Sequence, residues 1–208
     1  MMDCGSDYEK QWLPIIALEG PSGIGKTTLL RATAERLTRA AIPVEMASNN
    51  DSGRWHPVIR DLAAHPDRAL TLALATAAAR AELREGARRP LLCDRYVLST
   101  LVYQRFAGLP IDYLYSINRP LLSASVTIVL RLGADELTER RRGRPRKSDF
   151  FKDRLDINRE IELYDEGSAL LEQNGHHVSV VDASADENTI ADRLSAELTS
   201  SLAKFRLA

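Results

Sequence analysis

The chain has 208 residues, with 28 Lys and Arg against 29 Asp and Glu, which gives a formal net charge of −1 at pH 7. This length fits one domain with a substantial core. The balanced charge argues against a nucleic-acid-coating protein, which needs a strongly basic surface. The 2 cysteines are too few for a disulfide framework, so a reducing, cytoplasmic setting is expected. Small molecules are therefore the expected partners.

Neither a targeting segment nor a membrane span is expected. The first ten residues lack the basic start and the apolar core of a signal peptide. The apolar run over residues 70–79 is too short to cross a bilayer and is followed at once by Arg80 and Glu82.

Short apolar runs alternate with helical periodicities along the chain, and each predicts one element. The first half is expected to contain strand Leu13–Leu18, helix Thr28–Ala40, strand Ile42–Ala47, loop Ser48–Gly53, a helix opening at Pro57, helix Pro66–Glu85 and strand Leu91–Cys93. The second half is expected to contain helices Ser99–Phe106 and Asp112–Leu121, strand Val126–Leu130, a polar helix from Asp135, helix Asp149–Gln173, strand Val178–Val181 and a helix from Glu187. This alternation predicts a parallel sheet covered on both faces, with the ligand at the carboxyl ends of the strands.

The turn between the first strand and the first helix, from Gly20 to Thr27, matches the phosphate-binding pattern G-x-x-x-x-G-K-[ST] at every fixed position. We call this turn the P-loop. Its glycines let successive backbone N–H groups converge on phosphate oxygens, and the following helix adds the positive end of its dipole. Lys26 would reach the terminal phosphates, and the Thr27 hydroxyl would bind Mg²⁺. The expected ATP- and phosphate-binding residues are Gly20, Ser22, Gly23, Ile24, Gly25, Lys26, Thr27 and Thr28.

A second candidate motif, Asp94-Arg95-Tyr96, directly follows the predicted strand Leu91–Cys93. An Asp at this position can hold Mg²⁺ through water or orient an acceptor, while Arg95 can bind two phosphate oxygens at once. The alternative is a surface turn with an incidental ion pair.

The third motif is the basic segment 140–147, which carries Arg140 and Arg144. Such a density of like charge is self-repelling and does not belong in a packed core. As a lid over the transferring phosphates, it would supply positive charge and exclude water. Two alternatives are a solvated charge run and, because Gly143-Arg144-Pro145 resembles the core of an AT-hook, contact with the DNA minor groove. One copy in a neutral domain argues against DNA.

Taken together, these motifs resemble thymidylate kinase in order and in spacing. The resemblance rests on Glu19-Gly20 leading into the P-loop, Asp94-Arg95-Tyr96 with Ser99, Tyr103-Gln104, Leu137 with Arg140 and Arg144, and Val181-Asp182-Ala183-Ser184. It implies one P-loop kinase domain over residues 1–208, with a lid near residues 139–153. The implied fold is α/β: a three-layer P-loop NTPase fold with a five-stranded parallel sheet flanked by helices. The implied enzyme is a homodimeric phosphotransferase that uses MgATP and a nucleoside monophosphate.

The resemblance also implies roles for individual residues. Arg95 would bind phosphate, Gln104 would contact the base, and Arg80 would face the base. Because Gly23 stands where some relatives carry an Arg, the catalytic cation is expected in the lid. The expected catalytic residues are Lys26, Arg95, Arg140 and Arg144; the acceptor-binding residues are Ser22, Arg60, Arg80, Arg95, Tyr103 and Gln104; the metal-binding residues are Thr27 and Asp94.

The acceptor side departs from the family pattern. Ser22 stands where the family usually has an acid that contacts the acceptor sugar, residues 48–53 replace a Glu-Pro-Gly-Gly loop, and Ala79 replaces an acid. The acceptor is therefore expected to be dTMP or a related, modified nucleotide. The alternatives are a kinase of a nucleoside or another small hydroxyl compound, and an ATP-sensing or DNA-binding module that uses the basic segment.

Overall fold

A parallel five-stranded sheet runs through the described residues in the order β2-β3-β1-β4-β5. The computed structural model describes residues 12–48, 53–142 and 154–206. The strands are β1 (Ile15–Glu19), β2 (Glu45–Ser48), β3 (Leu91–Asp94), β4 (Ser125–Arg131) and β5 (His177–Asp182). Because β1 lies between β3 and β4, the turn after β1 emerges at the middle of the carboxyl edge, where ligands bind in open parallel sheets.

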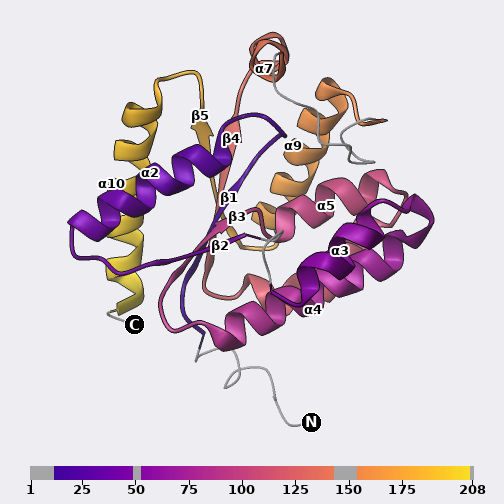
Figure 1. Cartoon of the computed structure of the whole chain (residues 1–208), viewed down its shortest axis with the longest axis horizontal. Helices are drawn as coiled ribbons and strands as arrows, with labels where there is room; N and C mark the ends of the chain where they lie inside the picture. Colours follow the sequence, from indigo (N-terminus) through magenta and orange to yellow (C-terminus); the bar gives the residue numbers. More distant parts are fainter. Residues whose placement is uncertain (1–11, 49–52, 143–153, 207–208) are drawn as a thin grey trace.

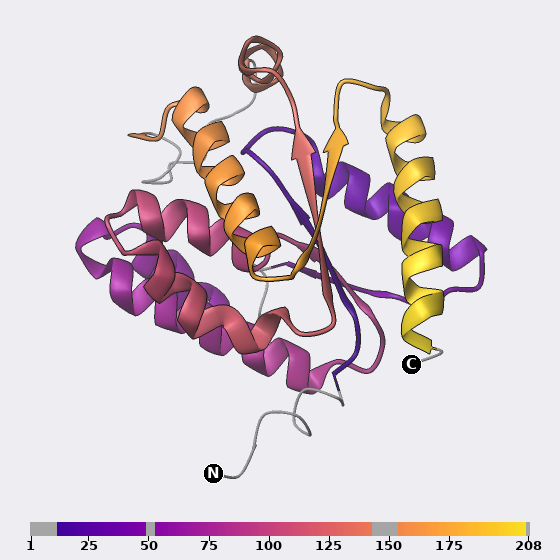
Figure 2. The ribbon, with the colours of Figure 1, turned by 180° about the vertical axis from the view of Figure 1, so that it is seen from behind.

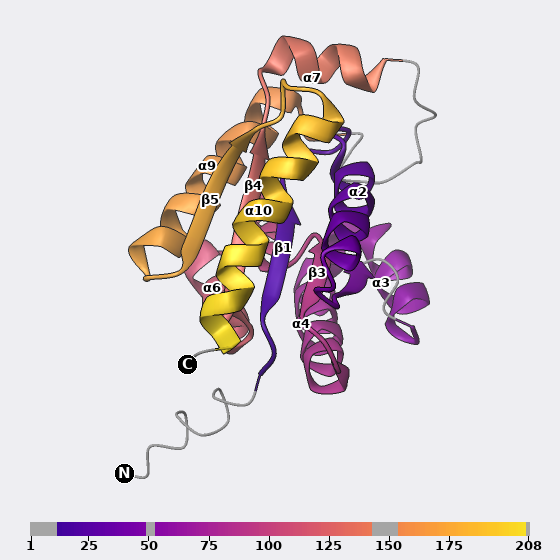
Figure 3. The ribbon, with the colours of Figure 1, turned by 90° about the vertical axis from the view of Figure 1, so that its left-hand side faces the viewer.

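Helices cover both faces of the sheet, as the sequence predicted. They are α2 (Lys26–Arg39), α3 (Trp55–Ala63), α4 (Ala69–Gly86), α5 (Val97–Phe106), α6 (Ile111–Asn118), α7 (Ala134–Arg141), α9 (Ile157–Gln173) and α10 (Glu187–Arg206), with short 3₁₀ turns η1 (Pro66–Arg68) and η2 (Arg119–Leu122). Helices α2 and α10 lie on one side of the sheet, and α3, α4, α5 and α9 lie on the other (Figures 1 and 2). Helix α7 lies beyond the carboxyl ends of the strands (Figure 3). The three-layer α/β fold is thus confirmed.

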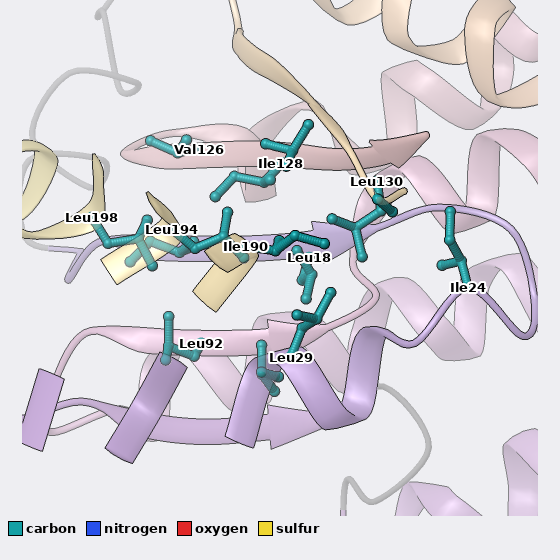
Figure 4. Packing of buried hydrophobic residues seen from close by; sticks show 14 of the residues in the cluster. Leu18, Ile24, Leu29, Leu92, Val126, Ile128, Leu130, Ile190, Leu194 and Leu198 are labelled. Atoms are coloured by element: carbon teal, nitrogen blue, oxygen red, sulfur yellow. The ribbon is translucent and has the colours of Figure 1, made fainter. Parts of the chain in front are cut away.

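Successive side chains of each strand point to opposite faces of the sheet, so the strands contribute to one hydrophobic core on each face. On β1, Ile16 and Leu18 face the α2 and α10 side, while Ile15 and Ala17 face the other layer. Figure 4 shows the first core, in which side chains from strands β1, β3 and β4 meet those of α2 and α10. These strands are buried on both faces, which explains why they lack an apolar–polar alternation.

Three of the predicted helices differ from the observed ones. The predicted helix Pro66–Glu85 is divided into η1 and α4. The predicted helix Asp112–Leu121 ends as α6 at Asn118, because the ring of Pro120 disfavours an α-helical continuation and the chain tightens into η2. Helix α9 begins at Ile157 because Asp156 is extended and caps it, accepting from two backbone N–H groups. The predicted start of this helix, Asp149, lies outside the described residues.

None of the helices in the described parts of the chain combines the length and the apolar character that a membrane crossing needs.

The first prediction concerns the core between the sheet and α2. Leu37 is fully buried there, so Leu37→Ala removes buried methyl groups and leaves a cavity. We expect it to lower the free energy of unfolding by about 2–5 kcal/mol in a urea titration. Leu13→Ala is the matched control, since Leu13 is 36% exposed and its truncation should cost about 0.5 kcal/mol. Equal effects at the two positions would contradict the described packing.

Candidate functional site

The P-loop joins the end of β1 to the start of α2. Gly20 has a φ of +136°, and a Cβ there would lie 2.7 Å from the Leu130 carbonyl oxygen of β4. Only glycine allows the loop to begin this close to the neighbouring strand. Gly25, with a φ of +108°, occupies the N-cap position of α2 without a side-chain cap. The first N–H groups of α2 are therefore left for a ligand, in the geometry that binds phosphate.

Two cations converge on this loop. Lys26 is 6% exposed, and its Nζ donates to the carbonyl oxygens of Gly20 and Pro21, each at 2.8 Å. Arg95 Nη1 lies 3.3 Å from the same Gly20 oxygen. Burial lowers the pKa of the Lys26 ammonium, and the charge of Arg95 lowers it further. Like charges held together in a buried position are stabilised by an anion.

Arg95 is held in a strained conformation that directs it to the P-loop. Its φ of 71° lies in the left-handed region, and its N–H donates to the Leu18 carbonyl oxygen at 3.1 Å. Its Nη1 also donates to Ser99 Oγ at 3.1 Å and to Tyr164 Oη at 2.6 Å. The guanidinium carbon lies 5.1 Å from the centroid of the Tyr103 ring. Strain of this kind persists where the surrounding structure fixes a functional side chain.

Glu19, the last residue of β1, fixes the helix that follows Arg95. Its carboxylate is fully buried and accepts the backbone N–H groups of Tyr96 at 2.6 Å and Ser99 at 3.1 Å. The Ser99 hydroxyl donates to the other oxygen at 2.6 Å. Tyr96 is the N-cap residue of α5, so a side chain from β1 caps a helix far along the chain. A carboxylate at this position also complements the helix dipole.

The two residues expected to bind metal lie together at the mouth of the loop. The Thr27 hydroxyl donates directly to Asp94 Oδ2. These hard oxygen ligands suit Mg²⁺, which binds proteins through one or two such groups and keeps several waters. The described residues contain no group of three or more His, Cys, Asp and Glu that could hold a metal by themselves. The donor set therefore fits an Mg²⁺ that arrives with a polyphosphate.

Tyr103 and Gln104, both expected to bind the acceptor, are consecutive residues of α5, and the Tyr103 ring lies beside the Arg95 guanidinium. The Tyr103 hydroxyl donates to Glu160 Oε1 at 2.7 Å. Gln104 is 6% exposed, and within the described residues its side-chain amide forms no hydrogen bond. This amide is not fully buried, because Arg84 Nε is the one fully buried side-chain polar atom without a partner in the described residues. Ser22 contributes backbone groups: its N–H donates to Glu160 and its carbonyl oxygen accepts from Arg141.

In the described part of the chain, neither Arg60 nor Arg80 forms a hydrogen bond or an ion pair with a residue of the P-loop. Arg60 is exposed on α3 and forms no hydrogen bond or ion pair with another described residue. Arg80 is 1% exposed, because its phase on α4 points it into the interior. There its guanidinium donates to Thr100 and Asn118 side chains and to the Tyr96 carbonyl oxygen, at 2.8–3.0 Å. Burial lowers the pKa of Arg80 to about 10.

The basic segment begins within α7, and three of its arginines, Arg140, Arg141 and Arg142, are described. Arg140 donates to the Ala183 carbonyl oxygen at 2.8 Å and lies 3.3 Å from that of Ile24. Arg141 instead crosses the P-loop: its Nε donates to the Ser22 carbonyl oxygen at 2.8 Å. The expected catalytic residue Arg144, and most of the expected lid, lie outside the described residues.

Comparison with known proteins agrees with this geometry. The family model described as thymidylate kinase matches residues 18–194. The chain belongs to the thymidylate kinase family. It is 29% identical over 204 residues to the thymidylate kinase of Xanthomonas campestris pv. campestris (strain B100), an alignment that covers 91% of this chain and 84% of that protein. It is 35% identical over 139 residues to the thymidylate kinase of Bacillus licheniformis, covering 58% and 64% of the two chains.

Membership in the thymidylate kinase family confirms the resemblance seen in the sequence and makes this chain a nucleotide kinase, that is, a phosphotransferase. The sequence motifs nevertheless missed Glu160 and Tyr164, and they included Arg141 only as a member of the basic segment. Glu160 had a signal, since it shares the apolar face of α9 with Leu163, Tyr164 and Gly167. A carboxylate within an apolar stripe is rarely tolerated without partners, so it marks a buried ion pair or a site.

The second prediction tests the Glu19 cap. Glu19→Gln turns one acceptor oxygen into an amide donor that faces existing donors. We expect the free energy of unfolding to fall by about 1–3 kcal/mol, the cost of leaving buried hydrogen-bonding groups unpaired, and kcat to fall because Arg95 loses its register. Glu45→Gln, on exposed strand β2, is the control. Unchanged stability and turnover in Glu19→Gln would show that α5 does not depend on this cap.

Proposed function

We propose that the protein is an ATP-dependent kinase that transfers the γ-phosphoryl group of ATP to dTMP or a closely related nucleotide. The observation that carries this proposal is the convergence of Lys26 and Arg95 on one P-loop carbonyl, from the ends of two adjacent strands. Phosphoryl transfer depends on positioning and charge neutralisation, which two such cations supply. Membership in the thymidylate kinase family supports dTMP as the acceptor.

On the donor side, the N–H groups of the P-loop and of the first turn of α2 would bind the β- and γ-phosphates. Lys26 would exchange its two loop carbonyls for phosphate oxygens, whose negative charge favours the ammonium form that burial disfavours. Thr27 and Asp94 would hold Mg²⁺. When bound, the ion offsets negative charge on the phosphates.

On the acceptor side, we propose that Arg95 binds the monophosphate and that Gln104 hydrogen-bonds the base. The position of Arg95 at the P-loop supports its assignment, and membership in the thymidylate kinase family supports that of Gln104. Ser22 and Tyr103 lie beside each other, since each donates a hydrogen bond to Glu160. The roles of Arg60 and Arg80 in acceptor binding remain predictions: Arg60 is exposed on α3, and Arg80 donates to Thr100, Asn118 and Tyr96.

The two alternatives are less well supported. A kinase of a free nucleoside leaves Arg95 without an acceptor phosphate, although its strained backbone and three side-chain contacts fix it at the P-loop. A DNA-binding module gives no role to the buried groups around Lys26.

A homodimer in the cytoplasm, with Mg²⁺ as cofactor, completes the proposal. Exposed apolar side chains on adjacent helices α3 and α4 support self-association: Val58 is 45% exposed, and Leu70 and Leu74 are each 47% exposed. Apolar residues gathered on adjacent helices often mark a protein interface.

The decisive experiment measures ADP release from MgATP with a panel of acceptors. The panel contains dTMP, dUMP, the other nucleoside monophosphates, free nucleosides and a blank without acceptor. We expect dTMP, or a close relative, to stimulate ADP release most strongly. Stimulation by a free nucleoside alone, or by no acceptor, would overturn the proposal.

The third prediction concerns the P-loop lysine. Lys26→Ala removes one preorganised cation, so we expect kcat to fall by about two to three orders of magnitude. Arg31→Ala removes an exposed cation from the same helix and should leave kcat unchanged. Circular dichroism would establish that both variants are folded. Normal turnover by a folded Lys26→Ala variant would contradict the assignment of the site.

A further inference from the structure

The buried carboxylate of Glu160 is a group to which the proposed chemistry assigns no role. Its side chain is 3% exposed. Oε1 accepts the Ser22 N–H at 2.9 Å and the Tyr103 hydroxyl at 2.7 Å. Oε2 accepts Arg141 Nη2 at 2.5 Å. The P-loop, α5 and α7 therefore meet on one carboxylate of α9.

Arg141 is fixed over the P-loop by this carboxylate. Its Nε donates to the Ser22 carbonyl oxygen, and its Cγ lies 2.9 Å from the position that a Cβ on Gly23 would occupy. Glycine at position 23 thus makes room for the stem of the arginine. A long side chain loses considerable rotamer freedom when it is ordered in this way, and the ion pair with Glu160 offsets that loss.

The donors that bind Glu160 are of the kind that binds phosphate. A backbone N–H of the P-loop and a guanidinium group both favour phosphate oxygens. Ser22 and Arg141 cannot give the same hydrogens to a carboxylate and to a phosphate, and two anions side by side repel each other. A phosphate that binds the hydrogens now given to Glu160 must therefore replace this carboxylate.

We propose that Glu160 is the positioning residue for Arg141 at the phosphoryl-transfer site, and that its carboxylate competes with the polyphosphate chain of the donor. The proposal rests on the proposed kinase function. Arg141 exchanges the carboxylate for a phosphate oxygen and is already in place when transfer begins. Glu160 thereby raises turnover while weakening nucleotide binding, because preorganised charge is the larger contribution to catalysis.

The first test is binding without an acceptor. Isothermal titration calorimetry would measure the Kd for inorganic tripolyphosphate with Mg²⁺ at low ionic strength. We expect Glu160→Gln to bind about tenfold more tightly than the wild type, because a negative charge beside the anion is removed. The difference should shrink as salt is added. Glu162→Gln is the matched control, because Glu162 lies on the same helix, is exposed and pairs with Arg159.

The second test separates charge from position. Glu160→Gln should lower both kcat and the KM for ATP, a combination that a purely structural defect does not produce. Glu160→Asp keeps the charge but is shorter, so nucleotide affinity should stay at the wild-type level while kcat falls. In an Arg141→Ala background, Glu160→Gln should change kcat little, because the arginine that it positions is absent.

Several results would overturn the proposal. The first is a Glu160→Gln variant that keeps the wild-type melting temperature but binds tripolyphosphate equally or more weakly. The second is additive effects of Glu160→Gln and Arg141→Ala on kcat. The third is a Glu160→Gln variant in which only the KM for the acceptor rises. Wild-type protein that binds no tripolyphosphate would also refute it. If the Glu160→Gln variant does not fold, the Glu160→Asp variant provides the test, with wild-type nucleotide affinity and a lower kcat as the expected result. The binding test uses no acceptor, so failure of dTMP as a substrate would refute the proposed function without affecting the Kd comparison.

Discussion

The buried carboxylate of Glu19 is the interaction on which the site depends. It ends the strand that leads into the P-loop and caps the helix that carries Ser99. Burying an ionised carboxylate is costly unless it is fully hydrogen-bonded and near opposite charge. Three donors and the neighbouring cations Lys26 and Arg95 meet both conditions. The same group therefore sets the distance between the two phosphate-binding motifs.

Helix α9 connects the second half of the chain to this site. Glu160 and Tyr164 lie one helical turn apart, so both reach the site: one binds the P-loop and the other binds Arg95. Gly167, in the next turn, lets α9 approach α5 closely, because a Cβ there would lie 2.6 Å from Leu98 Cδ1. Packing between these two helices thus helps to hold Arg95 and Arg141 in position, because α9 carries their partners Tyr164 and Glu160.

The candidate site combines clustered cations with carboxylates that hold them in place. Lys26, Arg95 and Arg141 bind groups of the P-loop, and Glu19 and Glu160 bind the elements that carry them. Such an arrangement needs little reorganisation when phosphates enter, because the donors already point to one place.

The sequence by itself determined the layered fold, the P-loop and the family, because these depend on local signals: apolar runs, helical periodicity and fixed spacing around Lys26. It also predicted the site edge occupied by Asp94 and Arg95. Only the tertiary structure decided that Glu160 binds Ser22 across 138 residues and that Arg80 points inward. Periodicity indicates which face of a helix is buried, but the partner of a buried charge depends on how distant elements pack, and no local pattern encodes that contact.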